Sequence, residues 1–246
     1  MIELKLDLSA VKRMGDRLEG VYAKDMPFLC AYALTKTMQG VQLAEREVMG
    51  SVFDRPTPYT QRSLAVIPAT KERLATQLHV REGGGTPAWK FLDPEIEGGA
   101  RRKKSFELRL ERAGILKPGE YVVPGAGIAL DAYGNIRGGT IERILSQLGA
   151  AEQWAGYQAN MTTRSRKRAL RKAGGRYFVL RGTKAPDGVY FRSGGKIVPV
   201  LIFVPRPHYR PRYPYYSTAE KIFGRAFAAN FHDGWRRYVA PKLKLR

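Results

Sequence analysis

The chain has 246 residues, of which 43% are apolar and 11% aromatic, so it can form a core of ordinary size. It carries 43 Lys and Arg against 22 Asp and Glu, a net charge of +21, and it has one cysteine, Cys30. A single cysteine excludes an internal disulfide and a multi-cysteine zinc site, and no apolar run approaches the length of a membrane span. Residues 153–246 hold 21 of the basic residues and only three acids, which predicts an anionic partner, either nucleic acid or an acidic protein surface.

The first part of the sequence predicts a strand, a short helix and one long helix. Apolar and charged residues alternate over 2–8, as in a half-buried strand, and Ser9 is placed to cap the short helix. A long helix is then expected over about 28–49, from apolar residues at three- and four-residue spacing: Ala31, Leu34, Met38, Val41, Ala44 and Val48. Two strand-like runs follow at 63–67 and 74–80, joined by a polar turn.

The middle of the chain, about 81–175, is predicted to be an irregular elaboration. It contains a short helix around Phe106 and Leu110, several turns, and a helix over 140–148. Strand-like runs at 176–181, 188–192 and 196–204 have tight connectors, which predicts an antiparallel meander.

A closing helix is expected from Ser217, which forms a capping box with Glu220, to Pro241, which should stop it. Its apolar face is supplied by Ile222, Phe223, Ala226, Phe227, Phe231 and Trp235. We therefore predict one α+β domain over 1–246, in which a long N-terminal helix and a C-terminal helix pack on a small antiparallel sheet, with the irregular middle elaboration inserted.

Catalytic groups are scarce. The three histidines are not at metal-binding spacing, and no nucleotide-binding or nucleophile motif is present, so no enzyme activity and no cofactor are expected. The best acidic cluster is Asp93, Glu95 and Glu97, close to a basic run at 101–104. Such carboxylates could hold Mg²⁺ for phosphodiester cleavage, but the neighbouring proline and glycines favour a charged surface turn.

The strongest charge signal is the run RSRKRALRKAGGR over 164–176, which has seven basic residues and no acid. It predicts either sequence-independent nucleic-acid binding or a loop that orders against a neighbouring subunit. The residues are Arg164, Arg166, Lys167, Arg168, Arg171, Lys172 and Arg176.

Two proline-rich stretches, 52–60 and 205–216, occupy equivalent places, one leaving the long helix and one entering the closing helix. Their prolines predict stiff joints rather than catalytic loops. Stiff segments lose little entropy when they are ordered at an interface, so we expect them to contact neighbouring subunits. The candidate interface residues are Asp54, Arg55, Tyr59, Arg210, Arg212, Tyr213 and Tyr215.

Three segments of the sequence resemble bacteriophage tail-completion and neck proteins of the minor tail protein Z-like family. They are ALTKTMQGVQLAEREVMGSVFDRPTPYTQRSL, GTPAWKFLDPEIEGGARRKKSFELRLERAGIL and YYSTAEKIFGRAFAANFHDGWRRYV. The resemblance covers most of the chain, although residues around 90–150 have no counterpart in the shorter members. It implies a structural, non-enzymatic role, and it carries no catalytic motif.

What the resemblance implies is a homo-oligomeric ring, hexameric or dodecameric, in the virion at the head–tail junction or the tail end. The implied partners are portal, adaptor or tail-tube proteins and double-stranded DNA in the channel, with synthesis in the bacterial host cytoplasm and no membrane. The alternatives are a phage-encoded nonspecific nucleic-acid-binding protein outside the virion and, less favoured, a Mg²⁺-dependent nuclease using residues 93–104.

Overall fold

The protein is described by a computed structural model that covers residues 16, 19–81, 86–151, 153–154, 157–158, 162–165, 167–168 and 174–243. The strand predicted over 2–8 and most of the short helix after it lie outside the described residues. The chain is α+β, as predicted, and it divides into two compact units. Unit 1 is Met1–Trp89 with Arg212–Arg246, and unit 2 is Lys90–Pro211. No helix among the described residues is both long and apolar enough to cross a membrane.

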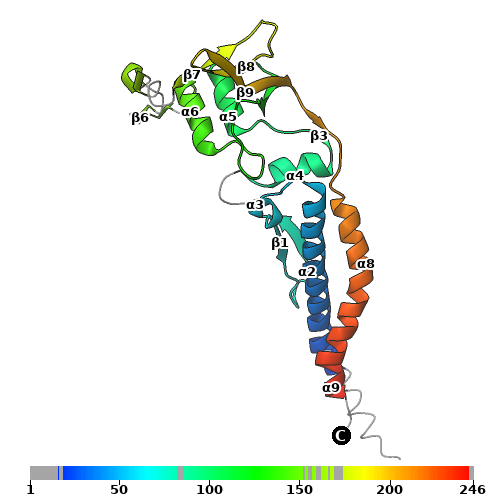
Figure 1. The fold of residues 1–246 in the computed structure, drawn as a ribbon. Helices are drawn as coiled ribbons and strands as arrows, with labels where there is room; N and C mark the ends of the chain where they lie inside the picture. The colour runs from blue at the N-terminus through cyan, green and yellow to red at the C-terminus, as the bar shows by residue number, and fades with distance from the viewer. Residues whose placement is uncertain are drawn as a thin grey trace, which may run out of the picture. The chain divides into compact units, whose positions relative to one another are not determined.

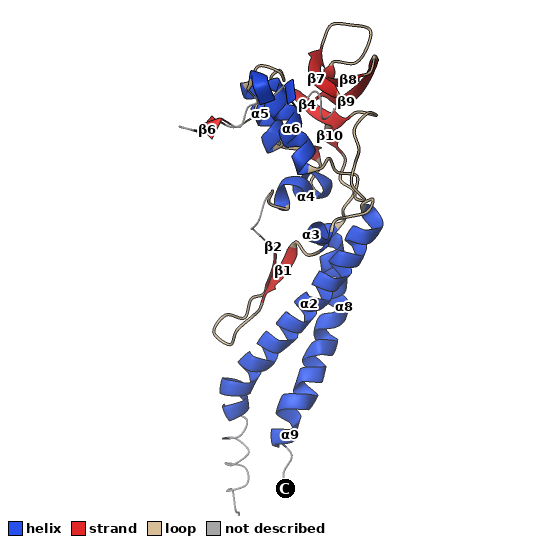
Figure 2. Cartoon of the chain, turned by 60° about the vertical axis from the view of Figure 1, so that its left-hand side comes forward, coloured by secondary structure: helices blue, strands red, loops and turns tan. Residues whose placement is uncertain are grey.

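Unit 1 is built on two long helices that run side by side, α2 and α8 (Figures 1 and 2). The helix α2 (Met26–Val52) confirms the long N-terminal helix, with Pro27 in its first turn as expected. A π-helical turn, η1 (Val21–Asp25), precedes α2, and the short α3 (Pro58–Gln61) follows it. The predicted strands 63–67 and 74–80 form the antiparallel hairpin of β1 (Leu64–Ile67) and β2 (Gln77–Val80), which packs against α2.

The closing helix differs from its prediction at both ends. The predicted capping box is wrong, because α8 (Tyr215–Gly234) begins two residues before Ser217, whose Oγ donates to the Pro214 carbonyl at 3.2 Å. Pro241 does not stop the helical path, which continues through a π-helical turn, η2 (Trp235–Val239), into α9 (Ala240–Leu243). Pro241 is tolerated because it stands in the first turn of the new segment, where the N–H that proline lacks needs no intrahelical acceptor.

Unit 2 is a four-stranded antiparallel sheet covered on one face by helices (Figure 1). The strands stand in the order β4 (Glu120–Pro124), β9 (Lys196–Pro205), β8 (Gly188–Ser193) and β7 (Gly175–Leu180). The predicted meander is therefore confirmed as β7–β8–β9. The predicted helices are confirmed as α5 (Ser105–Arg112) and α6 (Gly138–Leu148). Shorter strands pair β3 (Gly99–Ala100) with β10 (His208–Tyr209) and β5 (Gln153–Trp154) with β6 (Tyr157–Gln158).

The core of unit 2 joins α5, α6 and one face of the sheet. Leu110, Ile144, Leu145, Val189 and Leu201 are almost completely buried in it. Because the meander shares this core with the two helices, the inserted unit runs to Pro211, whereas the sequence placed the elaboration at about 81–175. The edge strand β4 was not predicted; its short EYVVP run is framed by turn residues and ends in a proline, as edge strands can.

The stretch predicted as a charged surface turn around Asp93 is instead a helix, α4 (Trp89–Ile96). Pro94 lies inside it and is itself buried, as are Leu92 and Glu95. In a helix this short, proline costs little hydrogen bonding, and burying Leu92 compensates for it.

Candidate assembly and nucleic-acid surfaces

The seam between α2 and α8 is lined by small and polar residues as well as apolar ones. The α2 side chains buried along it recur at every fourth position: Leu29, Ala33, Thr37, Val41, Glu45 and Met49. Of the stripe predicted from apolar spacing, Ala31 and Val41 are buried, whereas Leu34, Met38, Ala44 and Val48 are only partly buried. The prediction failed for these four because Thr37 and Glu45, which an apolar pattern passes over, occupy the seam.

Hydrogen bonds and one glycine fix the approach of the two helices. Asn230 of α8 donates its Nδ2 to Thr37 Oγ1 at 2.9 Å, and the Thr37 hydroxyl donates to the Ala33 carbonyl at 2.7 Å. At Gly234 the helices come so close that a Cβ atom would lie 2.7 Å from the Leu29 Cδ1 and 2.8 Å from the Tyr32 Cδ1. The seam therefore depends on small and hydrogen-bonding side chains in addition to large apolar ones such as Leu29 and Met49.

The aromatic side chains of α8 form a row beside this seam. Phe223 and Phe227 stack with ring centroids 5.4 Å apart, and the ring centroid of Phe231 lies 6.3 Å from that of Phe227. Phe231 and Trp235 pack on the buried cluster of Val21, Leu29 and Val239, but Phe223 and Phe227 stay only half-buried. Gly234 is the one fully buried residue of α8. Each of the four aromatic side chains therefore keeps a minor part of its surface exposed within the described part of unit 1.

A buried acid lies in the seam close to the start of α8. The Glu45 side chain is completely buried, and neither its carboxylate oxygens nor the neighbouring Tyr213 hydroxyl makes a direct hydrogen bond to a described residue. Burial raises the pKa of Glu45 from 4.5 to about 7. Burial, with the charge of Glu45, also raises the pKa of Tyr215 to about 12.

The two proline-rich stretches meet inside unit 1. The rings of Phe53 and Tyr213 lie 5.6 Å apart, and the Arg212 guanidinium stands 5.3 Å from the centroid of Phe53. The Tyr215 hydroxyl donates to the Leu78 carbonyl at 3.2 Å. Tyr213 is only 2% exposed, so its place among the predicted interface residues is wrong: this side chain is part of the chain's own core.

Of the remaining predicted interface residues Tyr215 is half-buried, and Asp54, Arg55, Tyr59, Arg210 and Arg212 are exposed. Arg55 pairs with the adjacent Asp54 at 2.9 Å, so this ion pair forms within one chain. Arg55 has a φ of 47°, in the left-handed region that non-glycine residues seldom adopt. Tyr59 donates its hydroxyl to the Thr86 carbonyl at 3.0 Å, and Arg210 is exposed in unit 2.

The basic run is described only in part. Arg164, Lys167, Arg168 and Arg176 are exposed, as the prediction required. Arg166, Arg171 and Lys172 lie outside the described residues. Arg176 stands in β7, so the run leads directly into the sheet of unit 2.

The acidic cluster does not form a metal centre. Within the described ranges no group of three or more His, Cys, Asp or Glu side chains is placed to hold a metal ion. Glu95 is buried. Arg101 pairs with Glu107 at 2.6 Å and Lys103 pairs with Glu111 at 2.9 Å, so neither cation is free to bind a phosphate. Glu95, Arg101 and Lys103, three of the residues in the stretch proposed for the nuclease alternative, are thus buried or paired within unit 2.

Glu107 is the centre of one such structural node. Its fully buried carboxylate accepts from both Arg101 Nη atoms, at 2.7 and 2.6 Å, and from the backbone amides of Lys104 and Val122. Burial alone would raise the pKa of Glu107, but these hydrogen bonds hold it below its usual range. The node ties the start of α5 to β4.

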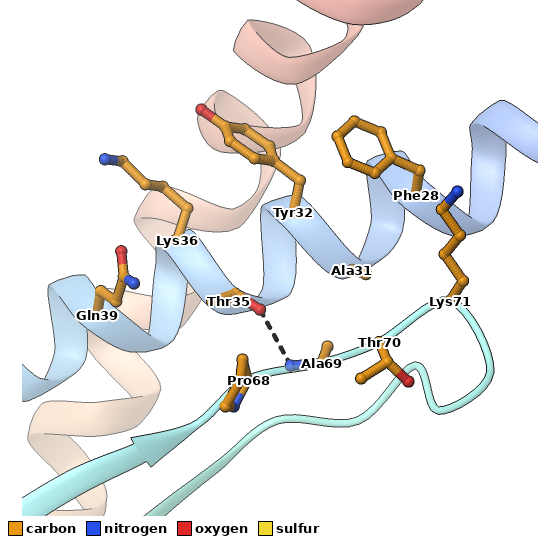
Figure 3. A pocket seen from close by; sticks show the side chains of 10 residues that line it. All are labelled: Phe28, Ala31, Tyr32, Thr35, Lys36, Gln39, Pro68, Ala69, Thr70 and Lys71. Carbon is orange, nitrogen blue, oxygen red and sulfur yellow. Dashed lines mark hydrogen bonds between the residues drawn. The ribbon is translucent and has the colours of Figure 1, made fainter.

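Figure 3 shows an open groove of about 460 Å³ between α2 and the connection from β1 to β2. Phe28, Tyr32 and Lys36 line it from α2, and Lys71 faces them from the connection. The Thr35 hydroxyl accepts a hydrogen bond from the Ala69 amide at 3.0 Å and closes its floor. The groove has no enclosed polar pocket of the kind that holds a small ligand.

Comparison with protein-family models, with curated proteins and with solved structures finds no match for this chain.

Proposed function

We propose that this chain is a structural, non-enzymatic protein of a bacteriophage virion, acting as a subunit of a homo-oligomeric ring at the head–tail junction or the tail end. The observation that carries the proposal is the one-sided packing of α8, whose aromatic row is only half-buried in unit 1. A helix with an apolar stripe needs a partner surface, and a second subunit supplies one. The sequence segments that resemble tail-completion proteins support the choice of this assembly.

Several further features support the proposal. Leu43 and Tyr216 are 58% and 60% exposed on the two long helices, which adds apolar surface for a neighbour. The excess of basic residues after Gln153 suits a channel that carries DNA or an acidic neighbouring ring.

The first test is the state of the purified chain in solution. Light scattering should give a closed oligomer, six or twelve subunits in the favoured arrangement, and Phe223→Gln with Phe227→Gln should yield folded monomers. Ile197→Gln, at an apolar residue of unit 2 that is 44% exposed, is the matched control and should keep the oligomer. A monomeric wild-type chain at high concentration, and at low and high salt, would contradict the ring.

The second test concerns the virion. Mass spectrometry of purified particles should find the chain in a fixed number of copies. Its absence from particles, together with tight DNA binding by the monomer, would favour the alternative of a phage-encoded nonspecific nucleic-acid-binding protein. That alternative is supported by the exposed cations Arg164, Lys167 and Arg168. The nuclease alternative would require Mg²⁺-dependent nicking of DNA that is lost in Asp93→Asn.

A further inference from the structure

The four-stranded sheet of unit 2 has one face in the core and a second face without acids. Val179 and Phe191 are on the core face. Side chains alternate along a strand, so the residues between them, including Arg176, Phe178 and Arg192, form the second face. Glu120 is the one acid in these four strands, and it lies on the core side, where it pairs with Arg181 at 2.6 Å. The second face therefore combines apolar and basic residues only.

Two arginines stand directly opposite each other on this face. Arg176 of β7 and Arg192 of β8 are partners in the register, and both are exposed. Like charges at directly opposite positions of an antiparallel pair destabilise it. No ion pair joins either arginine to an acid in the described parts of the chain, whereas Arg181 on the core side has both Glu120 and Asp187. The sheet thus carries an electrostatic cost that an external anion would remove.

Aromatic residues position one of these arginines. The Arg192 guanidinium lies 5.9 Å from the ring centroid of Phe178, whose ring is in turn 6.2 Å from that of Tyr190. A guanidinium held against a ring has already lost part of its rotational freedom, and its planar fork can bind phosphate oxygens in pairs.

We propose that this surface, which we call the arginine face (Arg176, Phe178 and Arg192), binds the phosphate backbone of nucleic acid without reading its sequence. Guanidinium forks and phosphate contacts give affinity and orientation but no base specificity. An extended polyanion fits better than a single acidic group, because Asp187 is the only acid between Gln153 and Ala219. The exposed cations Arg164, Lys167 and Arg168 precede the arginine face in the chain and extend the same charge.

The inference rests on the proposed function only for the source of the nucleic acid, which would be the DNA that passes the ring. The arginine face itself is a property of unit 2. A chain that binds DNA through it but is absent from virions rejects the virion role alone. If the chain is in the virion but its DNA affinity does not depend on these residues, only the arginine face is rejected.

The experiment is fluorescence anisotropy with the full-length chain and two labelled probes, a duplex DNA and an oligothymidylate of the same length, over a salt series. The double variant Arg176→Gln with Arg192→Gln should weaken binding at low salt by about tenfold or more. The slope of log K against log salt for the duplex should fall by about 2, since each phosphate contact contributes roughly 0.9. The probe for which the variant's affinity falls more shows whether the arginine face binds duplex or single-stranded DNA.

The matched control removes the same charge elsewhere: Arg225→Gln with Arg236→Gln, two exposed arginines of unit 1. This control should keep the wild-type slope to within about half a unit. An equal loss in both double variants would mean that net charge alone binds DNA, and would overturn the inference. Polyglutamate that competes as well as DNA would also overturn it, in favour of an acidic protein partner.

Folding is checked by thermal melting, which the exposed substitutions should leave nearly unchanged. If the double glutamine variant does not fold, Arg192→Lys decides instead. It keeps the charge but not the fork, so it should retain most of the salt slope while losing several-fold in affinity. Wild-type affinity in that variant, or no DNA binding by the wild type at low salt, would contradict the arginine face.

Discussion

The helix pair of unit 1 and the sheet of unit 2 bury their apolar side chains in different ways. In unit 2, α5 and α6 close one face of the sheet over large apolar side chains such as Phe106, Leu145 and Leu201, which are nearly inaccessible. In unit 1, α8 buries one glycine completely and meets α2 through Thr37 and Asn230. The first arrangement is complete in itself, whereas the second leaves an aromatic row beside the seam half-buried.

This difference suits the proposed assembly. A neighbouring subunit could cover the partly exposed aromatic row, so in the proposed ring α2 and α8 would form the assembly region. The sheet already has its core, and what it offers outward is the arginine face. The predictions below test whether the two units really depend on different contacts.

The largest effect is expected at the buried ion pair of unit 2. Glu107→Ala removes the partner of Arg101, whose side chain is only 12% exposed, and leaves two backbone amides without an acceptor. Breaking a buried pair in this way should cost about 3–5 kcal/mol of the free energy of unfolding. Chemical denaturation followed by circular dichroism measures it.

The control for that prediction is Asp54→Ala in the exposed pair with Arg55, which should leave the free energy of unfolding nearly unchanged. Similar costs for Glu107→Ala and Asp54→Ala would show that the node at Glu107 does not hold β4 to α5.

These two residues also illustrate what sequence reasoning can reach. Helices and strands with regular apolar spacing, namely α2, α5, α6 and the meander, were predicted at nearly their observed bounds, because burial of one face determines periodicity. Glu107 and Glu45 were not singled out, because a charged residue in an amphipathic pattern is assigned to the solvent. Glu107 is buried because Arg101 and the amides of Lys104 and Val122 donate to it, and spacing along the chain does not reveal these contacts.

The arginine face was missed for a related reason. The alternation in RYFVLR and VYFR is visible in the sequence, but it becomes informative only when β7 and β8 are in register. The register places Arg176 opposite Arg192, 16 positions along the chain. The basic run just before β7 was recognised because its residues are adjacent in sequence.

The second prediction concerns pH and unit 1. The raised pKa of Glu45 means that the folded chain keeps a proton that the unfolded chain releases above about pH 4.5. Its contribution to stability is therefore present at low pH, declines as the pH rises from 4.5 to about 7, and changes no further above that. The total decline is on the order of 3 kcal/mol.

Glu45→Gln, which keeps the shape and removes the charge, isolates this effect. Groups with lowered pKa values, such as Glu107, change in the opposite direction at acid pH, and subtracting the variant from the wild type cancels them. The variant should match the wild type near pH 4.5 and be more stable at pH 8, by denaturation at each pH. A difference that does not depend on pH would mean that the pKa of Glu45 is the same in the folded and the unfolded chain.

The third prediction is a matched pair of glycines on α8. Gly234→Ala places a Cβ against Leu29 and Tyr32, and such overpacking should cost about 1–3 kcal/mol. Gly224→Ala meets nothing within 4 Å and should stabilise the helix by about 0.5–1 kcal/mol. Thermal melting of both variants tests the seam: if Gly234→Ala is as stable as Gly224→Ala, the helices are not in close contact at Gly234.

The smallest effect is expected on the arginine face, and its sign is the informative part. Arg176→Thr removes one of two like charges that stand opposite each other, and threonine suits a strand, so the free energy of unfolding should rise by about 0.2–1 kcal/mol. The gain should shrink as salt is added, because exposed charges are screened. Denaturation at low and high salt measures both, and Arg225→Thr on α8 is the control for charge removal alone. A site kept for packing would lose stability when Arg176 is replaced, so a salt-independent loss would contradict the view that this arginine is retained for an external anion.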